Sequence, residues 1–126
     1  MLSMFVNATS LQTVPLLNTA AVTTMQNAFN NCPALQAVPA LVTTAVTSSG
    51  NFSAMFATCT SLARIEAKNF RFTFSVASCK LSSTALNEIY TNLPTVTGQT
   101  ITVTGNYGTT GDTPAIATAK GWTVTG

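Results

Sequence analysis

A hydrophobic pattern recurs along the first half of this chain and strongly limits the folds open to it. Each copy carries a Phe, then a Leu six residues later, then a Val or Ile three residues beyond that Leu. Successive copies start 24 and 27 residues apart, and periods of this length are typical of solenoids, in which each unit buries its apolar face only against its neighbours. The matching positions are Phe5, Phe29 and Phe56, then Leu11, Leu35 and Leu62, then Val14, Val38 and Ile65.

The pattern predicts an α/β repeat solenoid over residues 1–81, built from about three units of 24–27 residues. Each unit is expected to open with a short helical stretch, as at Met25 and Phe29, whose i, i+4 spacing places both side chains on one face. Pro33 then ends the helix, and residues 35–38 follow as an extended run. In the third copy, residues 69–76 alternate apolar with polar side chains and predict a half-buried strand.

The last third of the chain does not repeat. Ser82 is a candidate N-cap for a helix that Pro94 ends, and residues 100–104 are typical of a strand. A second short helix is expected over residues 115–120, ended by Gly121, with a final strand over 122–124. Because the end of a solenoid exposes an apolar face, we expect residues 82–126 to form a helix–strand–helix–strand cap, continuous with the same domain.

Few side chains are charged. The charged fraction is 6%, the net charge is +2, and 24 Thr residues supply much of the polar surface. A surface without charge repulsion indicates a subunit of a larger assembly. A Thr-rich β surface explains the same composition, since Thr suits a half-buried strand, so both interpretations stay open. The weak positive charge does not favour nucleic-acid binding.

Residues that would support catalysis or bind metal are scarce, so we expect no enzyme, no cofactor and no metal site. The chain has no His, which removes the usual base of a hydrolytic triad and a common zinc ligand. Its three Cys have no CxxC spacing and are expected to be buried apolar residues. No stretch approaches the ~20 apolar residues of a membrane span, and no leader-like segment is recognised, so no membrane insertion is expected.

Several runs resemble a known family. Met-x-x-x-Phe, a small residue three positions on, then Leu, Val-Pro and a Thr-rich stretch are similar to the BspA-type leucine-rich repeat of bacterial surface proteins and bacteriophage virion proteins; the clearest run is Thr9 to Thr19. The segments 81–87, 101–106 and 119–124 resemble an ending found in phage virion proteins that carry these repeats. The resemblance covers nearly the whole chain. The repeat together with this ending favours a phage protein over a bacterial adhesin.

The resemblance implies a non-enzymatic virion structural protein on the phage particle surface, either a capsid decoration (cement) protein or a tail module. Its expected partners are other virion subunits and further copies of itself, as a homo-oligomer. Because the chain starts inside a repeat, we expect a subunit interface at Met1, Leu2 and Phe5.

Two alternatives remain open. The first is a receptor-binding or adhesion module that recognises a host surface glycan or protein through Asn106, Tyr107 and Asp112, the candidate loop residues. The second is a fragment of a BspA-like adhesin at the bacterial cell surface.

Overall fold

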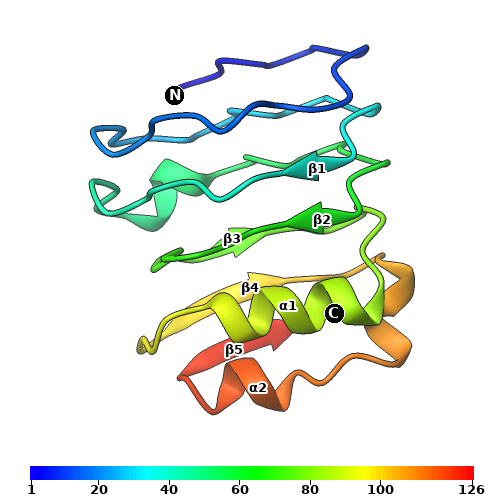
Figure 1. The fold of residues 1–126 in the computed structure, drawn as a ribbon. Coiled ribbons are helices and arrows are strands. Elements are labelled where there is room, and N and C mark those ends of the chain that lie inside the picture. The colour runs from blue at the N-terminus through cyan, green and yellow to red at the C-terminus, as the bar shows by residue number, and fades with distance from the viewer.

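The computed structural model describes all residues, 1–126, and Figure 1 shows the chain passing back and forth in successive levels from the N-terminus to the C-terminus. Two parallel sheets are present: β1 pairs with β2, and β3, β4 and β5 form a separate sheet in that order. No helix is long and apolar enough to cross a membrane. The elements are β1 (Ala37–Val38), the 3₁₀ turn η1 (Ser49–Phe52), β2 (Arg64–Ile65), β3 (Phe74–Ser75), α1 (Ser83–Asn92), β4 (Gln99–Thr102), the 3₁₀ turn η2 (Tyr107–Thr110), α2 (Ala115–Thr118) and β5 (Trp122–Thr125).

The predicted α/β repeat solenoid is wrong. The structure holds two α-helices and two separate parallel sheets of two and three strands, and no unit with the same elements recurs. The first predicted copy contributes only an isolated bridge at Thr13, whereas the third contributes one strand to each sheet. The helical openings are turns instead: Asn27, inside the expected helix from Met25 to Phe29, has a left-handed φ of 53°. A helix of five residues has little stability of its own, so tertiary packing decides whether it forms.

The spacing of the three phenylalanines nevertheless places them side by side. The Phe5 N–H donates to the Ala28 carbonyl at 2.9 Å, and the Phe29 N–H donates to the Met55 carbonyl at 3.0 Å. The Phe5 and Phe29 rings stack with centroids 5.4 Å apart, and Phe29 and Phe56 stack at 5.9 Å. Residues 24 and 27 positions apart therefore meet on neighbouring levels, with Phe5 on the first level, Phe29 on the second and Phe56 on the third. The stacked rings add to the burial of apolar surface.

One apolar core of 29 buried residues runs from Met25 to Trp122 and crosses the expected boundary between residues 81 and 82. The apolar residues of the first level, such as Phe5 and Leu11, pack against this core but are only half buried. Along the predicted strand of residues 69–76, only β3 forms, although Phe70 and Phe74 are both buried as the alternation indicates.

Residues 82–126 contain a helix, strand, helix and strand in the expected order. Ser82 caps α1, its hydroxyl accepting from the Ala85 N–H at 3.1 Å. At the other end of α1, the Lys120 ammonium donates to the carbonyls of Tyr90, Thr91 and Leu93 at 3.0, 2.6 and 2.9 Å. This cation satisfies free carbonyls at the negative end of the helix dipole, so it anchors the turn that follows α2 to the end of α1.

Candidate functional site

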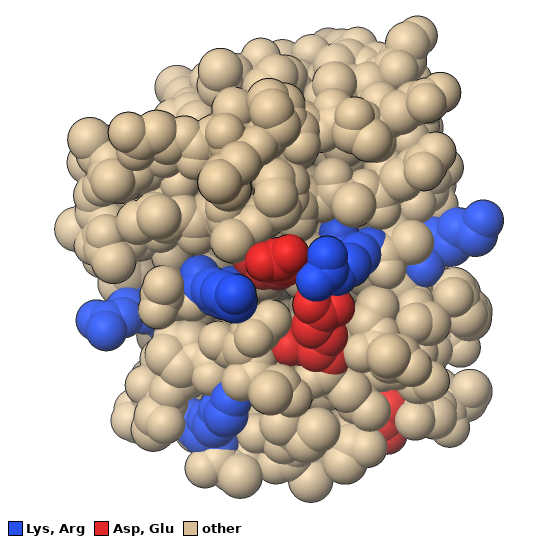
Figure 2. Space-filling view, in the orientation of Figure 1, with Lys and Arg blue, Asp and Glu red and all other residues tan.

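Charged side chains are confined to one half of the chain. The first charged residue is Arg64, and all eight Lys, Arg, Asp and Glu residues lie from there onward. In Figure 2 these side chains form a band across the middle and lower part of the visible face, and the upper part carries none. Residues 1–63 thus carry no charged side chain, and the exposed side chains of that segment are called the charge-free surface below.

Exposed large hydrophobic side chains concentrate on the charge-free surface. Leu16 is 77% exposed and Leu2 is 60% exposed. The segment that carries these side chains has no charged side chain to repel another protein. Five of the six exposed large hydrophobic residues belong to it, namely Leu2, Met4, Val6, Leu16 and Val42, and only Tyr107 lies elsewhere.

The three predicted interface residues lie together on the first level but are not equally accessible. The Met1 ammonium donates to the Thr24 carbonyl at 2.8 Å, and the Phe5 side chain is half buried against Phe29. Leu2 is the most exposed of the three. Any partner of this level would therefore meet the Leu2 side chain and the outer part of the Phe5 ring.

Asn106 does not fit its predicted role as a ligand-binding residue. It is buried, and its side-chain N–H₂ donates to the carbonyls of Val76 and Val103, both at 2.8 Å. Its amide oxygen accepts from the Leu81 N–H at 3.0 Å. Asn106 therefore links neighbouring levels by hydrogen bonds. Because an Asn amide has few further hydrogen-bonding positions, little of its hydrogen-bonding capacity is left for a ligand.

Asp112 and Tyr107 lie in different surroundings. A carboxylate oxygen of Asp112 accepts from the buried Tyr90 hydroxyl at 2.6 Å. Burial, and then this carboxylate, raise the pKa of Tyr90, so the phenol stays protonated and keeps donating. Tyr107 is 65% exposed. Of the three predicted ligand-binding residues, only Tyr107 presents its side chain freely.

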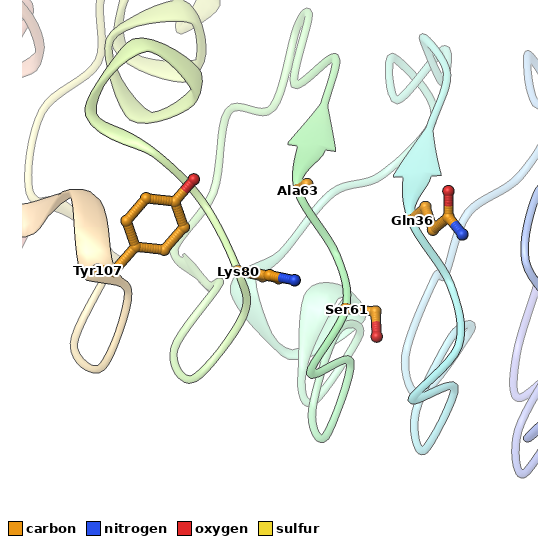
Figure 3. A pocket seen from close by; sticks show the side chains of 5 residues that line it. All are labelled: Gln36, Ser61, Ala63, Lys80 and Tyr107. Carbon is orange, nitrogen blue, oxygen red and sulfur yellow. The ribbon is translucent and has the colours of Figure 1, made fainter.

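A groove of about 290 Å³ lies next to Tyr107 and was not predicted. Figure 3 shows its lining side chains in a row across neighbouring levels. Backbone hydrogen bonds hold those levels in register: Ala63 N–H donates to Gln36 at 2.9 Å, and Lys80 N–H donates to Leu62 at 2.8 Å. The lining residues are Gln36, Ser61, Ala63, Lys80 and Tyr107.

Sequence spacing holds a signal for this groove. Ala63 follows Gln36 by 27 positions, and Tyr107 follows Lys80 by 27 positions, the same distance that separates Phe29 from Phe56. The apolar positions that follow this period are buried or half buried, whereas these four positions are exposed. The same period pairs Gln36 with Ala63 and Lys80 with Tyr107, but it does not join the two pairs, because Lys80 follows Ala63 by only 17 positions.

The charged cluster around Arg64 is an ion-pair network rather than a binding site. The Arg64 guanidinium contacts both carboxylate oxygens of Glu88 at 2.7 and 3.1 Å and Glu66 at 3.2 Å, and Lys68 lies 3.8 Å from Glu66. The hydrogen bond from Arg64 lowers the pKa of Glu88 below its ordinary value. The two-pronged contact joins α1 to β2 across the surface.

The cysteines are buried, as expected, and are free thiols. The Cys32 thiol donates to the Phe5 carbonyl and the Cys59 thiol to the Phe29 carbonyl, both at 3.0 Å. Burial raises the pKa of Cys59 to about 11 and that of Cys79 to about 12. Because the thiolate is the reactive form, neither residue has the character of a nucleophile.

Comparison with known proteins gives no relative from which a function can be read. No protein-family model, no curated protein and no solved structure matches the chain. The BspA-type resemblance therefore stays a prediction based on the residues quoted for it, and function is inferred from the chain's own surfaces.

Proposed function

We propose that this protein is a non-enzymatic structural subunit of a bacteriophage particle and binds neighbouring subunits through its charge-free surface. One observation carries the proposal: five of the six exposed large hydrophobic side chains lie in residues 1–63, where no side chain is charged. Burying apolar and uncharged polar side chains against another protein carries a smaller desolvation cost than burying charged ones. These side chains also lack the charge repulsion that keeps subunits apart.

The backbone of the first level supports the same role. Ser3, Phe5 and Asn7 donate their N–H groups to the second level, each at 2.9 Å. Within residues 1–126, the carbonyls of Leu2 and Met4 accept no backbone hydrogen bond. An edge with unpaired carbonyls and exposed apolar side chains can accept hydrogen bonds from a further segment that stacks on it as the first level stacks on the second.

The acidic side chains support a non-enzymatic role. Glu66 and Glu88 are in ion pairs with Arg64, and Asp112 accepts from Tyr90. General acid–base catalysis needs a titratable group placed against a substrate in a cleft. These three carboxylates are instead committed to contacts within the protein.

The location on a virion is inferred from the resemblance of residues 9–19 and of the C-terminal segments to phage proteins. The proposed site is the particle surface, as a capsid decoration subunit or a tail module, with other copies and other virion subunits as partners. A homo-oligomer is the expected assembly.

Electron cryomicroscopy of phage particles purified from cells that produce the chain tests this proposal. The expected result is density for the chain with Leu2, Leu16 and Val42 against a neighbouring subunit. Particles in which those side chains face solvent, while the charged half makes the contacts, would overturn the proposal. So would the absence of the chain from particles.

A further inference from the structure

We propose that the groove lined by Gln36, Ser61, Ala63, Lys80 and Tyr107 binds an oligosaccharide that bears one carboxylate group. Lys80 would hold a carboxylate, and the Tyr107 ring would lie against the face of a sugar. Gln36, Ser61 and Ala63 lie on the charge-free surface, but the groove uses none of the exposed large apolar side chains of residues 1–42, so this inference and the proposed assembly role are tested by different variants.

Lys80 supplies a cation that is not neutralised within the protein. Arg64 and Lys68 are held by carboxylates, and the Lys120 ammonium is used by three carbonyls. Lys80 takes part in no ion pair, and its side chain is exposed in the groove. It can therefore form a charge-assisted hydrogen bond with a ligand anion.

The number of cations indicates which anion is bound. Phosphate sites are usually built from several donors, such as Arg forks or converging backbone N–H groups. Lys80 is the one charged residue in the groove. A single ammonium matches a single negative charge, so the groove suits a carboxylate better than a doubly charged phosphate.

The remaining lining residues have the chemistry to bind sugar. Tyr107 is exposed and stands beside Lys80 in Figure 3, where its ring offers an apolar face and its hydroxyl a polar tip. The Gln36 amide and the Ser61 hydroxyl lie further along the same groove and can both donate to and accept from sugar hydroxyls.

The length of the row indicates an oligosaccharide. Gln36 to Tyr107 spans four neighbouring levels, and at about 4.8 Å for each step the row is roughly 14 Å long. A single sugar ring would leave one end of that row unused.

The other hollow in the molecule lacks this combination. It has a volume of about 380 Å³ and lies between Ser49 and Thr102, with hydroxyl groups along its wall. No charged residue lines it, and its two aromatic residues, Phe52 and Phe74, are buried in the core. The pairing of an unneutralised cation with an exposed aromatic ring is found in the Lys80–Tyr107 groove.

The test uses two acidic tetrasaccharides as probes, one with a single galacturonate and one with a single sialic acid, with a neutral galactose tetramer beside them, in calorimetric titrations of the full chain at low salt. The expected result is binding of at least one acidic probe about tenfold tighter than the neutral tetramer. Lys80→Gln and Tyr107→Ala should each weaken it by about tenfold, whereas Tyr107→Phe should retain most of it.

Arg71→Gln is the matched control, because it removes one positive charge at an exposed residue that is in no ion pair and does not line the groove. Its affinity should stay at the wild-type level. Equal losses in Lys80→Gln and Arg71→Gln, or equal binding of neutral and acidic tetramers, would overturn the proposal. Displacement by inorganic phosphate at the concentration of the sugar, or no binding of either acidic probe at millimolar concentration, would also overturn it.

Discussion

The Phe29 ring lies parallel to the Phe5 ring, with centroids 5.4 Å apart and planes within 8°. Phe29 also stacks on Phe56 and has no exposed surface. This residue joins three levels of the chain, so it is the most direct probe of their packing.

Replacement of Phe29 by Ala should lower the free energy of unfolding by ~3–5 kcal/mol, because it leaves a cavity where a fully buried ring was. Urea denaturation measures the change. Leu16→Ala is the control: its side chain is 77% exposed, so the loss should stay within ~0.5 kcal/mol. Equal effects of the two substitutions would show that the levels do not share a packed interior.

Replacement of Lys120 by Met should destabilise the C-terminal segment by ~1–3 kcal/mol, because the last carbonyls of α1 lose a charged donor. Thermal denaturation followed by circular dichroism measures the loss. Lys68→Met removes an exposed cation from a 3.8 Å ion pair and should cost less than ~1 kcal/mol. A Lys120→Met variant as stable as the wild type would rule out this anchor.

Asn106→Ala should cost ~2–3 kcal/mol, because the Leu81 N–H and the Val76 carbonyl lose their buried partner. Thr104→Ala, at an exposed neighbouring position, is the control and should change stability little. Chemical denaturation compares the two variants. An Asn106→Ala variant as stable as the wild type would show that the hydrogen bonds of Asn106 do not hold the levels together.

Stability should decline in alkaline solution partly through Cys59. Its ordinary pKa is 9.0 and its pKa in the folded protein is about 11. The folded state therefore keeps a proton that the unfolded state releases, so the contribution of Cys59 is fully present below pH 9 and is lost as the pH rises from about 9 to about 11. Urea denaturation at pH 8 and pH 10 measures the difference.

Cys59→Ala is the matched variant, since Ala8 occupies the corresponding position of the first level. Its stability should fall less between pH 8 and pH 10 than that of the wild type. The same fall in both proteins would show that the Cys59 thiol is not the group responsible.

Sequence periodicity predicts which residues lie against each other on neighbouring levels, but not the backbone conformation of those levels. Phe5, Phe29 and Phe56 meet because burial of their rings stabilises any backbone conformation that aligns them. The i, i+4 spacing of Met25 and Phe29 predicts one helical turn, yet Asn27 takes a left-handed conformation that Asn tolerates and a helix does not. Local apolar spacing does not distinguish these two backbones.

The C-terminal helix was predictable because its signals are local: Ser82 caps it and Pro94 follows its end. The candidate site was only partly predictable. Asn106 and Tyr107 both belong to a turn-rich stretch, and turn chemistry is the same whether a side chain points inward, as in Asn106, or outward, as in Tyr107. Lys80 was missed because its place beside Tyr107 depends on the register between levels.

Sedimentation velocity of the wild-type chain beside the Leu16→Ser/Val42→Ser double variant tests the proposed assembly role most directly. Both side chains are exposed on the charge-free surface, so the substitutions should leave the fold intact. We predict a wild type that associates with increasing concentration, a double variant that shifts toward monomer, and a Tyr107→Ser control that behaves as the wild type. A wild type that stays monomeric throughout, or a double variant that associates as the wild type does, would contradict the account.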